Sequence, residues 1–118
     1  MAPRKKKLDL LQGTLDLLIL QALVGRTRHG YEIARWIEAT TKSALSVEEG
    51  SLYPALHRMV QRGWLTATWG QSENNRRAKF YTLTRDGTAQ LGVERRKWSR
   101  FAEAMTLIVE SPSGEAVS

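Results

Sequence analysis

Residues 46–83, SVEEGSLYPALHRMVQRGWLTATWGQSENNRRAKFYTL, change from the apolar period of a helix to that of strands. In the first part, apolar residues recur at helical spacing: Leu52, Leu56, Met59 and Val60. Polar and apolar residues then alternate over 64–69 and 78–83, as they do in half-buried strands. The segment 70–77 between them is polar and rich in turn-forming residues. The stretch therefore predicts a helix that ends at Gly63, followed by a β-hairpin with a long tip.

The start of this helix carries two conflicting signals. Ser46 and Glu49 match a capping box, in which the serine accepts from the third helical amide and the glutamate reaches back. Pro54 lies further along, and a proline inside a helix removes one hydrogen bond at a cost of about 3 kcal/mol. Two starts fit these residues: a helix that begins nearer Gly50, or a distorted first turn after Ser46.

Two more helices are expected upstream. The first has the apolar spacing of one helix face at Leu15, Leu18, Ile19, Ala22 and Leu23. It is apolar on its other sides as well, through Leu10, Leu11, Leu17 and Leu20. Because a domain of this size does not easily cover both faces, part of this helix is expected to meet another subunit. The second helix is expected from about His29 to Thr40, with these residues inward: Tyr31, Ile33, Ala34 and Ile37.

A long helix is expected to follow the hairpin, over residues 85–109. Its apolar residues recur at every seventh position, the spacing of a helix that packs along another helix. At 1.5 Å per residue such a helix is about 38 Å long, more than this small domain can cover. A second subunit is the natural cover. The predicted dimer interface comprises Leu91, Trp98, Phe101, Met105 and Ile108.

The charge of the chain is concentrated at its N-terminus. The 118 residues carry a net charge of +6, and residues 4–7 supply four of the positive charges. The remainder holds 14 basic against 12 acidic residues. The cluster is compatible with a solvated tail and with a polyanion contact. The overall charge alone therefore does not decide whether the protein binds nucleic acid. We expect flexible tails at 1–7 and 110–118, a single domain over 8–84, and the long helix after it.

Several classes of protein are excluded by composition. The chain has no cysteine, and its two histidines, His29 and His57, have no carboxylate, nucleophile or metal-ligand partner at a recognisable spacing. We therefore expect no enzyme activity, no metal and no cofactor. The richest apolar run, residues 15–24, is too short to span a membrane. A cytoplasmic location is the expectation.

The order of elements is three helices, a hairpin and a long helix, so the fold class is mainly α with a small β-hairpin. This is the layout of a winged helix-turn-helix, in which the third helix enters the major groove of DNA. The third helix is expected to expose the DNA contacts Ser51, Tyr53, His57 and Arg58. The hairpin tip, or wing, is expected to contribute Asn74, Asn75, Arg76, Arg77 and Lys79.

Alternatives exist for each of these assignments. The outer face of the third helix is also compatible with an ordinary solvated surface. Tyr53 fits a packing position against the first two helices as well as it fits a groove contact. His57 fits a solvated position or a phosphate contact. A winged helix can also serve as a protein-interaction or RNA-binding module, although three cations on the wing favour a phosphate backbone.

Five blocks of the sequence resemble one family. They are GYEI at 30–33, GSLYPALH at 50–57, GW at 63–64, WGQSENNR at 69–76 and KFYTLT at 79–84. In combination they resemble the PadR family of bacterial transcriptional regulators, and LQGTL at 11–15 is similar to the start of these proteins. The resemblance covers roughly 8–109. The single C-terminal helix is typical of the short subgroup.

This resemblance implies a function. Members are homodimeric repressors that bind double-stranded DNA at inverted-repeat operators, reading it with the third helix and the wing. Such a protein is cytoplasmic, and it lies on the nucleoid when it is bound to DNA. Some short members hold a flat aromatic effector between the subunits, against a tryptophan of the last helix. Trp98 is the residue at the matching position here, and packing is the alternative role for it.

Overall fold

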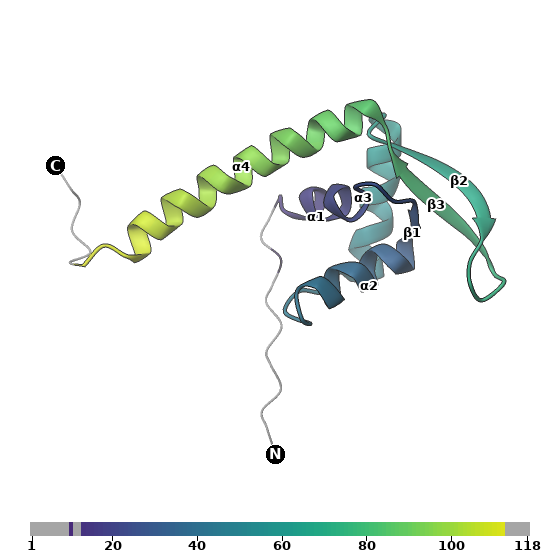
Figure 1. Cartoon of the computed structure of the whole chain (residues 1–118), viewed down its shortest axis with the longest axis horizontal. Coiled ribbons are helices and arrows are strands. Elements are labelled where there is room, and N and C mark those ends of the chain that lie inside the picture. Colours follow the sequence, from purple (N-terminus) through teal and green to yellow (C-terminus); the bar gives the residue numbers. More distant parts are fainter. Residues whose placement is uncertain (1–9, 11–12, 113–118) are drawn as a thin grey trace, which may run out of the picture.

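The computed structural model describes residues 10 and 13–112. It contains four helices and a small sheet (Figure 1). The elements in chain order are α1 Leu15–Ala22, β1 Arg28–His29, α2 Gly30–Thr40, α3 Glu49–Gln61, β2 Leu65–Gln71, β3 Arg77–Leu83 and α4 Arg85–Val109. The predicted fold class, a winged helix-turn-helix with a long C-terminal helix, is confirmed. The predicted tail at 1–7 lies outside the described residues.

The wing is the antiparallel pair β2 and β3, with Leu65 opposite Leu83 at its base and Trp69 opposite Lys79 further out. Its tip is tight: the Asn75 amide donates to the Ser72 carbonyl (2.9 Å), and Asn75 adopts a left-handed φ of 58°. Asparagine tolerates this conformation better than most residues. The structure adds a strand that the sequence did not predict. This strand, β1, pairs with the side of β3 that β2 leaves open. It has only two residues, too few to show an alternating pattern.

The core lies between α1, α2, α3 and the base of the sheet. Its fully buried side chains include Ile19, Leu20, Leu23, Ile33, Ile37, Leu52, Leu56, Met59 and Leu65. Leu20, one of the residues that make α1 apolar on its other sides, is buried within this chain. Among its described residues, α1 therefore leaves less apolar surface for a partner than the sequence indicated.

The start of α3 differs from the predicted capping box. Glu48 is the N-cap residue, its side chain makes no capping hydrogen bond, and the helix begins at Glu49. Val47 lies in the extended segment before the helix and is buried in the core. Burial of Val47 outside the helix takes Ser46 away from the capping position. The later start agrees with the alternative that places the beginning near Gly50, and Pro54 remains inside the helix.

The first part of helix α4 lies alongside α1, and its outer part extends beyond the rest of the molecule (Figure 1). Thr84 caps it, since the Thr84 hydroxyl accepts a hydrogen bond from the Gly87 amide (2.9 Å). From Arg95 to Val109 every residue is exposed except the half-buried Ala102. The Cα radius of gyration, 17.2 Å, exceeds the value of about 13 Å that is typical of a compact domain of 100 residues. Within the described residues no helix has the length and apolarity that a membrane crossing needs.

Candidate nucleic-acid interface

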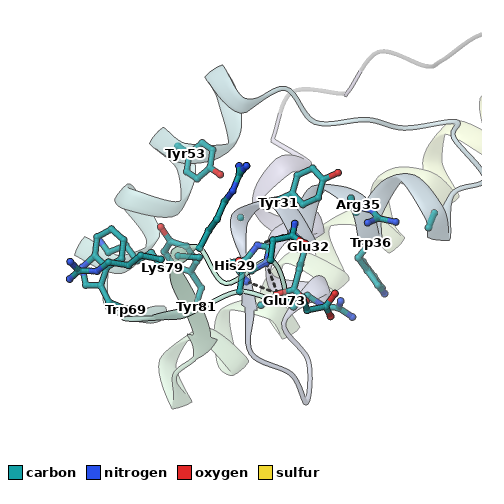
Figure 2. A pocket seen from close by; sticks show the side chains of 18 residues that line it. His29, Tyr31, Glu32, Arg35, Trp36, Tyr53, Trp69, Glu73, Lys79 and Tyr81 are labelled. Atoms are coloured by element: carbon teal, nitrogen blue, oxygen red, sulfur yellow. Dashed lines mark hydrogen bonds and ion pairs between the residues drawn. The ribbon is translucent and has the colours of Figure 1, made fainter.

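An open cleft of about 1130 Å³ lies between the start of α2, the exposed side of α3 and the wing (Figure 2). Five aromatic side chains line it: Tyr31, Trp36, Tyr53, Trp69 and Tyr81. Five cationic side chains line it as well: Arg28, Arg35, Arg76, Arg77 and Lys79. Only two carboxylates, Glu32 and Glu73, belong to its lining. The cleft therefore carries excess positive charge beside flat rings.

The wall formed by α2 begins with a reciprocal cap. The Glu32 amide donates to His29 Nδ1 (3.3 Å), and the His29 amide donates to Glu32 Oε1 (3.2 Å). Nε2 of His29 also lies 3.2 Å from Glu32 Oε1, and the ring packs edge-on against Phe80 at 5.3 Å between centroids. Because the Glu32 carboxylate is engaged here, it opposes an incoming anion less than a free carboxylate would.

Beyond this cap, α2 presents residues that the sequence did not assign to the interface. Tyr31 was expected to point inward, but it is 59% exposed, and the Arg35 guanidinium lies 5.7 Å from its ring centroid. The Arg28 guanidinium lies 5.7 Å from the Trp36 ring. Tyr31 follows the apolar period of α2, and this obscured its role. The one sequence signal against an inward position was Arg35, a cation four positions later on the same side of the helix.

Of the residues predicted on α3, Ser51, Tyr53 and His57 are exposed, and Tyr53 lines the cleft. Tyr53 also packs against α2, since a Cβ added at Gly30 would lie 2.8 Å from Cε1 of its ring. The ring is nevertheless 45% exposed. Tyr53 thus combines the two roles that the sequence left open: it fills the space that Gly30 leaves and still shows an edge to the cleft.

Arg58 is held within the fold. Its two terminal nitrogens bind the two carboxylate oxygens of Asp16 on α1, at 2.9 and 2.6 Å. This bidentate hydrogen bonding raises the pKa of Arg58 above its ordinary value, and partial burial opposes the shift. The guanidinium joins α3 to α1, so its strongest donors point away from the cleft.

The wing presents its predicted residues to solvent. Asn74, Arg76, Arg77 and Lys79 are exposed and line the cleft, while Asn75 supplies the left-handed residue of the turn. Within the described part of the chain, none of the three wing cations forms an ion pair with a carboxylate. Their charges are therefore available to an external anion.

The predicted dimer stripe on α4 divides into two parts. Leu91 is only 4% exposed and belongs to the core of its own chain. Trp98, Phe101, Met105 and Ile108 are exposed, and the Trp98 and Phe101 ring centroids are 6.0 Å apart. Trp98 and Phe101 also line a second cleft of about 440 Å³, whose other wall is formed by Gly13, Thr14 and Leu17.

The described residues contain no group of three or more His, Cys, Asp or Glu side chains that could hold a metal ion. The first cleft offers groups suited to binding: cationic N–H groups for phosphate oxygens, and rings and hydroxyls for flat or polar surfaces. A winged helix with a basic wing and an exposed third helix is the arrangement typical of winged-helix proteins that bind DNA.

Comparison with known proteins identifies the family. Residues 19–93 match the family described as transcriptional regulator PadR-like, and the chain belongs to it. A PadR family transcription regulator from hypervirulent Clostridium difficile is 29% identical, with 82% of this chain and 99% of that chain covered and a TM-score of 0.69. A PadR-like regulator from Bacillus cereus is 25% identical over 85% and 95% of the two chains, with a TM-score of 0.71.

A transcriptional regulator from Clostridium thermocellum shares the fold, with a TM-score of 0.76, 24% identity, and 84% and 96% of the two chains covered. Because it belongs to the PadR-like family, the chain is a DNA-binding regulator of transcription, and this family is in general not enzymatic. Family membership favours DNA over the alternative of a protein-interaction or RNA-binding module.

Proposed function

We propose that this regulator is a homodimeric repressor that binds an inverted-repeat operator in double-stranded DNA. The observation that carries the proposal is the charge of the cleft beside the exposed side of α3. Its lining contains five cations and only two carboxylates. In this arrangement α3 enters the major groove and the wing lies along the adjacent backbone. Such a protein acts in the bacterial cytoplasm, on the nucleoid.

The roles of individual residues follow from their exposure. Ser51 and His57 meet base edges or phosphates, with Tyr53 at the side of the groove. Arg76, Arg77 and Lys79 contact phosphates from the wing, with Asn74 beside them. Arg35 and Tyr31 extend the contact to α2. Arg58 holds α3 at its angle through Asp16 and is not among the proposed base contacts.

The homodimer is supported by α4. Its outer half exposes Trp98, Phe101, Met105 and Ile108, and a second copy of the helix would cover these side chains. Two copies present two wings and two α3 helices, so an inverted repeat with half-sites one helical turn apart, or a multiple of it, matches the symmetry.

Release by a flat aromatic effector completes the proposal, and Trp98 in the second cleft is the residue that would stack on it. Titration with planar aromatic compounds should quench tryptophan fluorescence, and the quenching should disappear in Trp98→Phe. Quenching that survives in this variant would remove Trp98 from the effector site, and absence of quenching in the wild type would leave it a packing role.

The test of the DNA interface is the salt dependence of binding to a duplex pool of random sequence. Two phosphate contacts contribute about 0.9 each to the slope of log K against log[salt], so Arg76→Ala with Arg77→Ala should reduce the slope by about 2. The loss should be the same for every sequence. Arg26→Ala removes one exposed charge outside the cleft and should leave the slope unchanged.

Selection from the same pool reports specificity. Ser51→Ala with His57→Ala should broaden the selected sequences while the salt slope changes less than it does in the wing variant. Duplex RNA should compete poorly, because its deep, narrow major groove does not admit a helix. An unchanged salt slope in the wing variant, or equal competition by RNA, would contradict the proposed function.

A further inference from the structure

Trp69 has an exposure that packing does not explain. It lies on β2 with 56% of its surface exposed and lines the cleft near the outer end of the wing. Leu65 and Tyr81, on the same face of the hairpin, are buried at the base, where they reach the core. Packing in the core therefore explains the aromatic ring of Tyr81 at the base of the sheet, but it does not explain the ring of Trp69.

The neighbours of Trp69 are two cations of the wing. The Arg77 guanidinium carbon lies 4.6 Å from the ring centroid, and the Lys79 ammonium nitrogen lies 5.7 Å from it. Lys79 is directly opposite Trp69 in the ladder, and Arg77 is its diagonal neighbour. Figure 2 shows Trp69 and Lys79 together at one end of the cleft, across from Arg35 and Trp36.

The type of contact matters for what these cations can do. A carboxylate partner would neutralise them and occupy their N–H groups, as Asp16 does for Arg58. The face of a ring attracts a cation and leaves its N–H groups free to donate to another acceptor. Within the described residues, Arg77 and Lys79 have the ring of Trp69 as their shared neighbour and no carboxylate.

We propose that Trp69 is a positioning residue for DNA binding: its ring holds Arg77 and Lys79 in the orientation in which they meet the phosphates of a duplex. This inference rests on the proposed function. Long cationic side chains lose rotamer freedom when they bind, and side chains that are already oriented lose less. The ring thus raises affinity without adding a charge, and it acts through the two cations.

The experiment is a mutant cycle read by fluorescence anisotropy with a random-sequence 25-base-pair duplex, at several low KCl concentrations where weak binding remains measurable. Trp69→Leu keeps an apolar side chain on an exposed strand. It should weaken binding about tenfold, in line with the ordering cost of two side chains, and the salt slope should stay unchanged because both charges remain. Trp69→Phe keeps a ring and should restore most of the affinity.

The same change is then made in a background that carries Arg77→Ala and Lys79→Ala. Trp69→Leu should cost nothing further there, since no cations remain to be oriented. A second tenfold loss in that background would show that the ring contacts the duplex directly or shapes the hairpin, and it would overturn the inference. So would wild-type affinity of Trp69→Leu alone.

Thermal melting of each variant separates positioning from folding. The proposal would also be overturned by the following combined result: Trp69→Leu melts well below the wild type, and Trp69→Phe binds the duplex no better than Trp69→Leu does. If the wild type fails to bind the duplex, the proposed function fails and this inference fails with it. If the wild type binds and the variant with Arg77→Ala and Lys79→Ala is weakened, while Trp69→Leu shows no coupling, only this inference fails.

Discussion

The cleft and the outer half of α4 both expose aromatic rings, but the rings have different neighbours. In the cleft, Tyr31 and Trp69 have cations within 6 Å of their ring centroids. On α4, the Trp98 ring has the Phe101 ring beside it at 6.0 Å. Residues of the same type therefore suit different partners: a hydrated polyanion at the cleft and a second apolar surface at α4. Exposure alone does not distinguish the two surfaces, whereas the neighbouring charge does.

The largest effect is expected from placing charge on the apolar surface. Phe101→Glu with Met105→Glu should dissociate the proposed dimer, because unpaired charges buried at an interface cost about 3–5 kcal/mol. This cost would raise the dissociation constant of the dimer at least about a hundredfold. Sedimentation should show a monomer that still binds a single half-site through an unaltered cleft.

The matched control adds two glutamates elsewhere on the same helix. Ser99 and Thr106 lie about 100° or more around α4 from the centre of the stripe, so Ser99→Glu with Thr106→Glu should leave the dimer intact. A dimer that persists in Phe101→Glu/Met105→Glu would place the interface elsewhere and remove the contrast between the two surfaces.

The second prediction concerns the junction between the surfaces. Gly87, in the first turn of α4, is buried, and a Cβ there would collide with the backbone carbonyl oxygen of Trp64, which cannot move aside as a flexible side chain can. Gly87→Ala should cost about 3 kcal/mol and lower the melting temperature by about 10 °C or more. Both DNA binding and dimerisation should weaken, since the cleft and α4 lose their fixed relation.

Gly92 offers the comparison within the same helix. A Cβ at Gly92 would meet only the end of the Arg96 side chain, at 3.3 Å. Gly92→Ala should therefore stabilise the helix by about 0.5–1 kcal/mol. Equal melting temperatures for the two alanine variants would show that the packing of Gly87 against Trp64 is not what fixes the start of α4.

The smallest effect is expected from the pH dependence of the cleft wall. Burial raises the pKa of Tyr81, and the charge of a nearby ionised Tyr53 raises it further. The folded state thus keeps a proton that the unfolded chain loses near pH 10, so this contribution is complete below that pH and is lost as pH rises through the folded pKa.

Chemical denaturation between pH 9 and pH 11 measures this effect. The free energy of unfolding of the wild type should fall more steeply with pH than that of Tyr81→Phe, which lacks the titrating group. The difference in slope, rather than the stability of either protein, is the quantity of interest. Parallel curves would show that burial of Tyr81 at the base of the cleft has no effect on its ionisation.

Much of the site followed from local pattern. The alternating residues 64–69 and 78–83 predicted the hairpin, and the polar segment between them predicted an exposed basic tip. Arg35 and Tyr31 could not be assigned in this way, because the apolar period of α2 includes Tyr31 and no local rule says that a neighbouring helix leaves it uncovered. The partner of Arg58 was also hidden, since Asp16 is 42 residues away in sequence.

The sequence by itself determined the order of elements, the extent of α4 and the basic wing, because each depends on residues within a few positions of one another. Only the tertiary structure decided which exposed rings face cations, that Leu20 and Leu91 belong to the chain's own core, and that Arg58 is engaged by α1. These outcomes depend on how the helices are placed against one another. Helix placement results from side-chain packing across the whole core, and this packing depends on residues that are far apart in the sequence.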